Sequence, residues 1–323
     1  MLVRKQLVSL VTGGCGFIGN EVCRALLSHG HHVICMDNLY SSEISNIRDL
    51  LNDPCFEFIR HDVCLPYNIE SDYVFNLACP ASPIHYQRDP VKTINTNVTG
   101  ALNALDNARR TGARIFQAST SEVYGDPLVS PQSEAYFGNV NPFGVRACYD
   151  EGKRCAESLF FEYKQQFDVD IRVGRIFNTY GPRMHTNDGR VVSNFIMAAL
   201  SGEDLVVYGD GRSTRSLCYL TDTVSAILEL TLGASDYWKP VNIGSPFELS
   251  ILEIAEAVLR LTDSKSKIVF SPPLSDDPRQ RRPEIGLIKD LLGWAPKVTV
   301  DEGLNQTIHY FKKNYFSGEN MRG

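Results

Sequence analysis

A glycine-rich turn between an apolar strand and a helix constrains this chain more than any other feature. Residues 10–19 read LVTGGCGFIG and place Gly13, Gly16 and Gly19 at that junction. Glycines there let the backbone turn tightly and leave free N–H groups at a helix N-terminus, where phosphate binds well. The spacing is G-x-x-G-x-x-G rather than the commoner G-x-G-x-x-G of dinucleotide sites. Because glycines also end ordinary strand–helix turns, the triad needs its context before it predicts a dinucleotide.

The first half of the chain alternates β-branched apolar runs with helical patterns. Such alternation requires right-handed crossovers between parallel strands. We therefore predict an α/β fold with a Rossmann-type doubly wound parallel sheet. The predicted strands are 7–12, 32–37, 56–62, 73–78, 114–120 and 170–178, and the predicted helices lie near 17–29, 91–111 and 148–167.

From about residue 179 the sequence changes to shorter elements separated by Gly and Pro, such as NTYGPRM and VYGDGRS. This texture is typical of a smaller region built partly of loops. We predict that residues 1–178, with return segments near 216–245, form the dinucleotide-binding domain. Residues 179–323 are expected to form mainly the substrate-binding domain.

Composition excludes several classes of function. A net charge of −6 disfavours a nucleic-acid or membrane surface, both of which require a basic stripe. The nine cysteines include no C-x-x-C pair, so we predict neither a disulfide framework nor a metal site, and we expect most cysteines to be buried. The opening MLVRKQLVSLVTGG lacks a signal-peptide pattern, and no apolar run approaches about 18 residues. We expect a cytoplasmic protein without a membrane span.

The second predicted strand ends in an acidic residue that bears on the choice of cofactor. Asp37, in HVICMDN, stands where a carboxylate bonds the ribose hydroxyls of a dinucleotide. The same carboxylate repels a 2′-phosphate, and the following DNLYSS contains no Arg or Lys to offset that repulsion. NAD is therefore favoured over NADP. Asp62, at the end of the third predicted strand, is either an adenine contact or an ordinary turn residue.

Tyr149 and Lys153, in ACYDEGKRCAE, lie one helical turn apart on the same face. A tyrosine that acts as a base near pH 7 needs its pKa lowered by about three units, or about 4 kcal/mol. A helix dipole contributes at most about 1–2 kcal/mol. A lysine ammonium and the positive nicotinamide ring of NAD+ can supply the rest, and Thr120, at the end of the fifth predicted strand, can hold the same substrate oxygen. We predict that these three residues are catalytic rather than part of a solvated helix face.

The chain resembles the UDP-glucuronate decarboxylase (UDP-xylose synthase) family, a branch of the extended short-chain dehydrogenases/reductases. The resemblance runs over about residues 5–315 and rests on TGGCGFIG, STSEVYGDP, NPFGVRACYDEGKR, RIFNTYGPRMHTNDGRVVSNFI and DDPRQRRPEI. It implies that NAD+ oxidises the sugar at C4, that the resulting β-keto acid loses CO2, and that the hydride then returns. The implied catalytic residues are Thr120, Glu122, Tyr149, Lys153 and Arg281.

The resemblance also implies which residues bind the two ligands. Those expected to bind the cofactor are Gly13, Gly16, Phe17, Ile18, Gly19, Asp37, Asn38, Tyr40, Ser42, Asp62, Val63, Leu77, Thr96, Ala118, Tyr149, Lys153, Thr179 and His185. Those expected to bind the UDP-sugar are Asn95, Asn103, Asn178, Arg190, Tyr208, Arg215 and Arg281.

Two of these residues bear on decarboxylation itself. Glu122 lies two residues beyond Thr120 and faces the same side if the strand continues. Arg281 matches an active-site arginine of the family. We assign the pair to holding the sugar carboxylate and protonating C5, without deciding which residue gives the proton. Arg190 precedes an apolar helical stretch, which suits a phosphate contact at a helix start, and Tyr208 packs either on uracil or in the core.

Other readings share part of this pattern. A sugar-nucleotide 4-epimerase forms the same ketone but has less use for a Glu/Arg pair, and a 4,6-dehydratase normally has an Asp–Glu pair where this chain has Ser121–Glu122. A non-catalytic NAD-binding sensor has no need of the catalytic residues. The chain also departs from the decarboxylases at Asn95, where a lysine is expected, and at Cys79, where serine is usual. The family further implies a homodimer that pairs the helices near 91–111 and 148–167.

Overall fold

Seven parallel strands form the central sheet in the order β11-β6-β5-β4-β1-β2-β3. The structure is a computed structural model that describes residues 6–187, 189–273 and 280–316. The strand order reverses direction between β1 and β4, which in such sheets opens a ligand crevice at the carboxyl ends of the strands. The strands are β1 (Val8–Thr12), β2 (His32–Asp37), β3 (Phe56–Arg60), β4 (Tyr73–Asn76), β5 (Arg114–Thr120), β6 (Ile171–Ile176) and β11 (Pro240–Ile243).

The predicted Rossmann-type sheet is confirmed, with small differences at the strand ends. β3 and β6 end earlier than predicted because the residues that follow them turn into the crevice instead of continuing a ladder. The edge strand β11 comes from a segment far along the chain, and the pattern of the sequence did not identify it as a strand. The first four residues of the DDPRQRRPEI motif lie outside the described residues.

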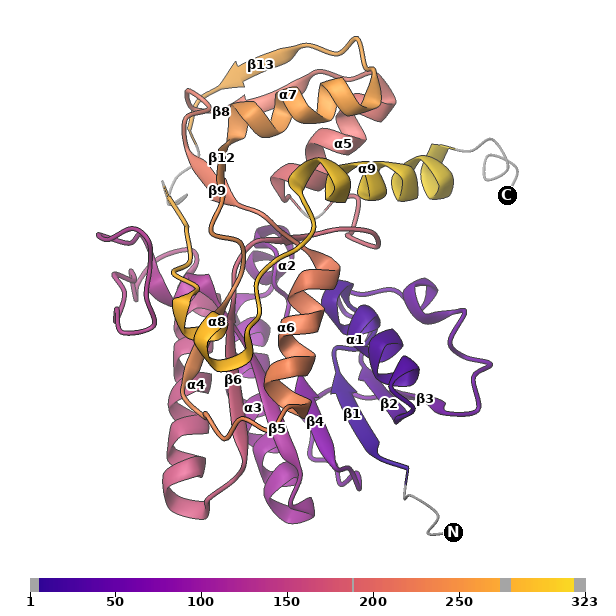
Figure 1. Ribbon diagram of the computed structural model, residues 1–323, viewed down its shortest axis with the longest axis vertical. Helices are drawn as coiled ribbons and strands as arrows, with labels where there is room; N and C mark the ends of the chain where they lie inside the picture. Colours follow the sequence, from indigo (N-terminus) through magenta and orange to yellow (C-terminus); the bar gives the residue numbers. More distant parts are fainter. Residues whose placement is uncertain (1–5, 188, 274–279, 317–323) are drawn as a thin grey trace.

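Helices cover both faces of the sheet (Figure 1). Because successive side chains of a strand point to opposite faces, Leu10 packs with α3 and α4 while Val11 packs with α1, α6 and α8. Leu10 and Val11 are both fully buried, and burial of each such side chain stabilises the fold by about 1.5–3 kcal/mol. The helices are α1 (Phe17–Ser28), α3 (Pro90–Thr111), α4 (Ala147–Phe167), α6 (Leu220–Leu232) and α8 (Gly286–Leu292).

α3 and α4 form the most closely packed helix pair on their face of the sheet. Asp89 caps α3 by accepting a hydrogen bond from the backbone N–H of Lys92 (3.0 Å), and Pro90 occupies the first helical position. Where the helices cross, a Cβ on Gly152 would lie 2.9 Å from the Asn97 side-chain nitrogen. Glycine at this position therefore allows the close approach that brings the start of α4 to the crevice.

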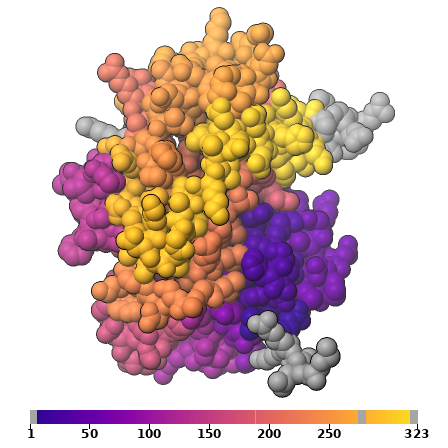
Figure 2. Space-filling view, viewed as in Figure 1, coloured from indigo at the N-terminus to yellow at the C-terminus, as the bar shows by residue number. Residues whose placement is uncertain are grey.

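The C-terminal half builds an upper lobe with its own apolar core, which includes Ile196, Val207, Ile254 and Ile308. In Figure 1 the earlier elements of this lobe are salmon-pink and the later ones are orange to yellow. In Figure 2 the yellow C-terminal segments cross the front of the molecule from the lower body to this lobe. Its main elements are α5 (Val191–Ser201), β8 (Leu205–Tyr208), α7 (Ile251–Thr262), β13 (Ile268–Ser271) and α9 (Val300–Phe311).

Short elements connect the body and the lobe. β7 pairs with β10 in parallel, and β9 pairs with β12 antiparallel. A single turn of helix, α2 (Pro83–Arg88), lies where the body meets the lobe (Figure 1). The remaining elements are η1 (Ile44–Ile47), η2 (Ser121–Tyr124), β7 (Thr179–Tyr180), β9 (Thr214–Ser216), β10 (Cys218–Tyr219), β12 (Glu248–Ser250) and η3 (Lys312–Phe316).

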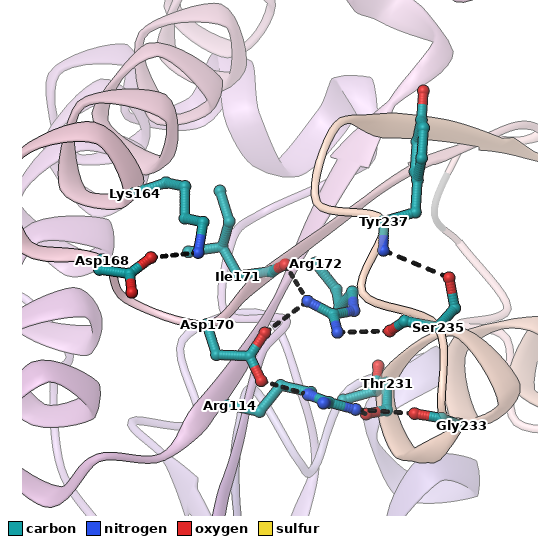
Figure 3. A network of polar contacts seen from close by, with 10 residues as sticks. All are labelled: Arg114, Lys164, Asp168, Asp170, Ile171, Arg172, Thr231, Gly233, Ser235 and Tyr237. Carbon is teal, nitrogen blue, oxygen red and sulfur yellow. Dashed lines mark hydrogen bonds and ion pairs between the residues drawn. The ribbon is translucent and has the colours of Figure 1, made fainter.

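A partly buried polar network joins the amino-terminal ends of β5 and β6 to the end of α6 (Figure 3). Asp170 accepts hydrogen bonds from Arg114 (2.7 Å) and Arg172 (2.6 Å). Arg114 also donates to the carbonyl oxygens of Thr231 (2.9 Å) and Gly233 (2.8 Å), which satisfies the last turn of α6. This network lies at the end of the sheet opposite the crevice, so it stabilises the fold without contacting the site.

Two expectations from composition are tested by the structure. All nine cysteines are free, but only four are buried, four are partly exposed and Cys155 is exposed, so the expectation that most are buried is wrong. Several cysteines lie on connecting segments rather than on the core faces of strands and helices, which explains the difference. Within the described residues, no helix combines the length and apolar character needed to cross a membrane.

Candidate active site

A cavity of about 1040 Å³ runs along the carboxyl ends of the strands, between the sheet and the upper lobe. It is long enough to hold two ligands end to end, because its walls extend from the glycine turn to β8. Most of the residues predicted to bind cofactor or substrate line it. They are Gly13, Gly16, Phe17, Ile18, Gly19, Asp37, Asn38, Tyr40, Ser42, Val63, Leu77, Thr96, Ala118, Thr120, Glu122, Tyr149, Lys153, Asn178, Thr179, Arg190, Tyr208, Arg215 and Arg281.

The glycine turn has the geometry of a pyrophosphate cradle. Gly13 has a φ of +70°, and a Cβ there would lie 2.8 Å from the backbone of Ala78. A Cβ on Gly19 would lie 2.1 Å from the Gly13 carbonyl oxygen, so side chains are excluded at both positions. α1 begins directly after Gly16, and no described side chain caps this helix end. Its uncapped N–H groups and helix dipole suit a dinucleotide pyrophosphate.

Asp37 is fixed at the end of β2 by three hydrogen bonds. Its carboxylate accepts from the backbone N–H of Cys15 (3.0 Å) and of Leu39 (2.8 Å) and from the Ser42 hydroxyl (2.7 Å). The side chain is 7% exposed, so the negative charge is held in one place at the cavity wall. A carboxylate held in this way suits ribose hydroxyls and opposes a 2′-phosphate. The residues present therefore fit NAD.

Four predicted site residues do not line the cavity. Asp62 forms an ion pair with Lys92 (2.8 Å), and although burial raises its pKa, the hydrogen bond from Lys92 and others hold the pKa of Asp62 below its ordinary value. Asn103 donates to the Val63 carbonyl oxygen (2.8 Å). Asn95 accepts from Thr99 (2.7 Å) beside a shallow groove on α3. For these residues the ligand contacts stay predictions.

The fourth of these residues, His185, lies on the segment that follows β7. Its Nε2 atom is 3.8 Å from a carboxylate oxygen of Glu43, and its ring packs edge-on against that of His85. These contacts link the upper segment to the body near the cofactor half of the cavity. A contact of His185 with the cofactor stays a prediction.

Tyr149 and Lys153 lie together on α4 and are both buried, with exposed fractions of 6% and 4%. The Lys153 ammonium donates to the Ala118 carbonyl oxygen (2.8 Å) and lies 5.9 Å from the centre of the Tyr149 ring. Burial raises the pKa of Tyr149, and Cys79 and Glu122 act in the same direction. Burial also lowers the pKa of Lys153. The protein alone therefore keeps the phenol protonated, and additional positive charge is needed to make it a base.

Glu122 reaches the cavity by a different route from the one predicted. The strand does not continue past Thr120, because Ser121–Tyr124 forms the short 3₁₀ helix η2, which begins when Thr120 accepts a hydrogen bond from the Glu122 N–H (3.2 Å). The condition under which Glu122 would face the same side as Thr120, a continuing strand, is thus not met. The helical turn nevertheless directs the Glu122 side chain into the cavity, where it is 9% exposed.

Two arginines hold the Glu122 carboxylate. Both terminal nitrogens of Arg281 donate to its two oxygens, and Arg146 donates to Oε2 (2.8 Å). Burial on its own raises the pKa of Glu122, but the charges of Arg281 and Arg146 outweigh burial and hold the pKa below its ordinary value. Arg281, Arg146 and Glu122 together therefore carry a net positive charge, which the neighbouring Asp150 offsets only in its ionised form.

Sequence reasoning missed three residues at this end of the cavity. Arg146 was inside the quoted NPFGVRACYDEGKR motif but was not singled out, although a cation three residues before the base was a usable signal. Asp150 is 6% exposed. Its burial, and to a smaller extent the charge of Glu122, raises its pKa to about 7. Tyr86 on α2 stacks on Tyr149, with ring centres 5.1 Å apart. Nothing in the sequence pattern pointed to Tyr86.

Among the described residues, no cluster of acidic, histidine or cysteine side chains could hold a metal ion.

Comparisons with known proteins agree with this geometry. The sequence profile of the NAD dependent epimerase/dehydratase family matches residues 9–244. The chain belongs to that family. NAD is the cofactor that the family description names, and the glycine turn and Asp37 fit it.

Similar members of the NAD dependent epimerase/dehydratase family include decarboxylases and an epimerase. UDP-glucuronic acid decarboxylase 6 of Arabidopsis thaliana is 54% identical over 298 residues, which is 91% of this chain and 86% of that protein. UDP-glucuronic acid decarboxylase 1 of Xenopus tropicalis is 51% identical over 310 residues, or 96% and 73% of the two chains.

Among solved structures, a variant of the UDP-glucuronic acid 4-epimerase of Bacillus cereus, in complex with NAD and UDP-4-deoxy-4-fluoro-glucuronic acid, is 25% identical. It superposes with a TM-score of 0.88 and covers 96% of this chain and all of that one. The family fold thus extends through both the body and the upper lobe.

Proposed function

We propose that this chain is an NAD-dependent UDP-glucuronate decarboxylase that forms UDP-xylose through a 4-keto intermediate. Relatives about half identical over nearly the whole chain carry the name of that activity. The observation that carries the proposal is the pair of guanidinium groups beside the proposed base Tyr149, of which Arg281 is buried and Arg146 partly buried. A sugar that is oxidised at C4 and bears a carboxylate at C6 requires that combination.

The chemistry at C4 uses three residues. The Tyr149 phenolate removes the proton of the sugar 4-hydroxyl, and the Thr120 hydroxyl holds the same oxygen. NAD, which the glycine turn and Asp37 would hold, would supply the hydride acceptor for C4 and the hydride for the final reduction. Lys153 supplies a fixed positive charge that stabilises the phenolate form of Tyr149. Because burial raises the pKa of Tyr149, this charge and that of the oxidised cofactor must act together.

The chemistry at C5 and C6 uses the arginine cluster. Oxidation at C4 makes the substrate a β-keto acid, whose C5–C6 bond breaks with its electron pair delocalised onto the C4 oxygen. Tyr149 and Thr120 stabilise that oxygen, as an oxyanion site does. Arg281 and Arg146 present more positive charge than Glu122 neutralises, so they suit the C6 carboxylate. Orientation of this carboxylate is the step that separates decarboxylation from the hydride chemistry that relatives share.

The upper lobe provides the groups that suit the uridine diphosphate. Arg190 lies at the N-terminus of α5 and donates to the Ala81 carbonyl oxygen (3.2 Å) across the cavity. Arg215, 9% exposed, lies on β9, and Tyr208, 48% exposed, ends β8. We propose that the two arginines contact the diphosphate and that Tyr208 packs on uracil. Residues 179–323 are accordingly proposed to be mainly the sugar-nucleotide domain, and residues 1–178 with segments 216–245 the NAD domain.

One incubation tests the function. The purified protein is mixed with UDP-glucuronate and an excess of NAD+, and CO2, nucleotide-sugar mass and nicotinamide absorbance are followed. We expect CO2 and UDP-xylose in equal amounts, with no net NADH. Stoichiometric NADH with a released keto-pentose would instead identify an oxidative decarboxylase.

A 4-epimerase remains the alternative to exclude, because an epimerase that is 25% identical superposes on the whole chain. Such an enzyme must let the keto-sugar rotate within the site, and the sugar must keep its C6 carboxylate. In the same incubation it would give a product of unchanged mass and no CO2. The two outcomes cannot be confused.

We also propose that the protein is a homodimer that pairs α3 and α4 with their copies. Apolar side chains are exposed on these helices, including Val91 (76%), Ile94 (40%) and Phe161 (46%). Burial of such a row between two copies is a common way to form a twofold interface. The nine free cysteines suit the predicted cytoplasmic location, which stays a prediction.

The dimer is tested by placing a charge in the exposed row. Ile94→Glu should shift the sedimentation coefficient at micromolar concentration from dimer to monomer, because two buried carboxylates would face an apolar surface. Leu51→Glu is the matched control, since Leu51 has a similar exposed fraction (43%) but lies outside α3 and α4. A wild-type protein that sediments as a monomer would refute this interface.

A further inference from the structure

Tyr86 is a second buried tyrosine in direct contact with the presumed base. It lies on α2, is 1% exposed and lines the cavity. Its ring is stacked on that of Tyr149, with ring centres 5.1 Å apart and planes 7° from parallel. α2 lies where the body meets the upper lobe (Figure 1), and it packs against the start of α4, where the Cys148 thiol donates to the Tyr86 carbonyl oxygen (3.7 Å).

The Tyr86 hydroxyl has no hydrogen-bond partner among the described residues. Other buried tyrosines do have partners: Tyr124 donates to Asn242 (2.7 Å), and Tyr219 donates to Gln306 (2.8 Å). A buried hydroxyl without a partner costs free energy unless a ligand or water satisfies it. Because this hydroxyl belongs to a cavity residue, a group of the bound sugar is the natural partner.

Decarboxylation requires a proton at C5, and the two residues first considered for it cannot supply one. Glu122 accepts hydrogen bonds from Arg281 and Arg146 on both oxygens, so it is held as a carboxylate. Arginine does not release a proton under these conditions. Tyr149 and Thr120 are engaged with the C4 oxygen in this step, and Asp150 does not line the cavity. The donor must therefore be another neutral group with an O–H or N–H close to Tyr149 and to this cluster.

We propose that the Tyr86 hydroxyl is a catalytic acid that delivers the proton to C5 of the sugar after CO2 has left. This proposal rests on the proposed decarboxylase function and names the residue for a step that the function requires. The phenol keeps its proton until that step, because burial raises the pKa of Tyr86. A phenol is also a stronger acid than the C–H bond it forms beside a ketone, so the transfer is downhill.

The step balances in atoms and charge. The C5–C6 bond breaks, its electron pair becomes the C4–C5 enolate, and CO2 leaves as a neutral molecule. The enolate carbon then takes the proton of the Tyr86 O–H bond, which gives the C4 ketone and a Tyr86 phenolate. Arg146 and Arg281, no longer holding the sugar carboxylate, lie in the field of that phenolate and stabilise it. Water returns the proton to Tyr86, so one turnover consumes one proton.

The test is a single turnover of the NAD-loaded protein with UDP-glucuronate labelled at the carboxyl carbon. CO2 release and nicotinamide absorbance are followed together in wild type and in Tyr86→Phe, which removes one oxygen and keeps the ring stack. Tyr67→Phe is the matched control, because Tyr67 also has a buried hydroxyl without a partner but does not line the cavity. Binding of NAD+ and UDP to each variant shows that the site is intact.

Tyr86→Phe should form NADH and release CO2 at nearly wild-type rates but reoxidise NADH about 10²–10⁴-fold more slowly, as expected for a missing general acid. Tyr67→Phe should match wild type in all phases. Wild-type reoxidation in Tyr86→Phe would overturn the proposal, and so would an equal slowing of all three phases, which would indicate a structural role. If wild type itself released no CO2, the proposed function would be wrong and this step would not be needed.

Discussion

Replacement of Arg281 by lysine tests the part of the site that separates decarboxylation from hydride transfer. Arg281 is 5% exposed and uses both terminal nitrogens on Glu122. Lysine keeps the positive charge but is a single point donor, so it cannot hold Glu122 and a sugar carboxylate in the planar arrangement of a guanidinium. The contacts of Lys153 with Ala118 and of Thr120 with Glu122 do not involve Arg281, so the chemistry at C4 should survive.

The size of the effect follows from the contacts that are lost. At least one charge-assisted hydrogen bond of the fork disappears, and each such bond contributes about 1.5–3 kcal/mol. At about 1.4 kcal/mol for each factor of ten, CO2 release should fall about 10–150-fold. Arg146 still donates to Glu122, which keeps that carboxylate ionised and prevents a larger collapse of the site.

The assay is the same single turnover, with CO2 and nicotinamide absorbance measured separately. NADH formation should remain within a few-fold of wild type while CO2 release slows. Arg282→Lys is the matched control, because its side chain is 43% exposed, lies 3.8 Å from Glu248 and does not line the cavity. Wild-type CO2 release by Arg281→Lys would refute the role of the guanidinium fork and would favour the epimerase alternative.

Two further perturbations test the base and the fold. Tyr149→Phe should lower turnover by about two to four orders of magnitude and leave NAD+ and UDP binding largely intact, so near-normal turnover would exclude the phenol as base. Asp170→Asn should lower the free energy of unfolding by about 1–2 kcal/mol without changing kcat, because Asp170 is partly exposed (46%) and far from the cavity. Although burial raises the pKa of Asp170, the hydrogen bond from Arg114 and the charge of Arg172 lower it overall, so its contribution is present above about pH 4 and lost as pH falls further. Denaturant unfolding from pH 7 to pH 3 measures both effects, and a variant with an unchanged pH dependence would contradict the linkage.

Local sequence patterns were sufficient for six of the seven strands of the central sheet and for the main features of the cofactor half of the cavity. The glycine turn, Asp37 and the i, i+4 pair Tyr149 and Lys153 each follow from strand–helix periodicity and from spacing within one element. Such features are set by neighbours in the chain, so a single sequence reveals them.

The substrate half depends on contacts between distant segments. Arg281 meets Glu122 across 159 positions of sequence, and Tyr86 meets Tyr149 from a different helix, α2 instead of α4. Only the family resemblance pointed to Arg281, and nothing pointed to Tyr86, because a tyrosine in a loop-like segment has no distinctive pattern. Glu122 was placed correctly in the cavity for the wrong reason, since a 3₁₀ turn and not a strand directs its side chain.

The burial that makes Tyr149 a poor base by itself also makes its activation dependent on ligands. Without a ligand, burial raises the pKa of Tyr149 and lowers that of Lys153, so the charge pair that catalysis needs is disfavoured on both sides. A positively charged nicotinamide changes that balance only while the cofactor is oxidised. The base is therefore active when a hydride can be accepted, and after the transfer the same tyrosine is protonated and able to stabilise the enolate. Burial also raises the pKa of Tyr86. This phenol therefore keeps its proton until the sugar has lost its carboxylate. Two stacked phenols of similar environment can thus act as base and acid in sequence, and their order is set by where the substrate charge lies.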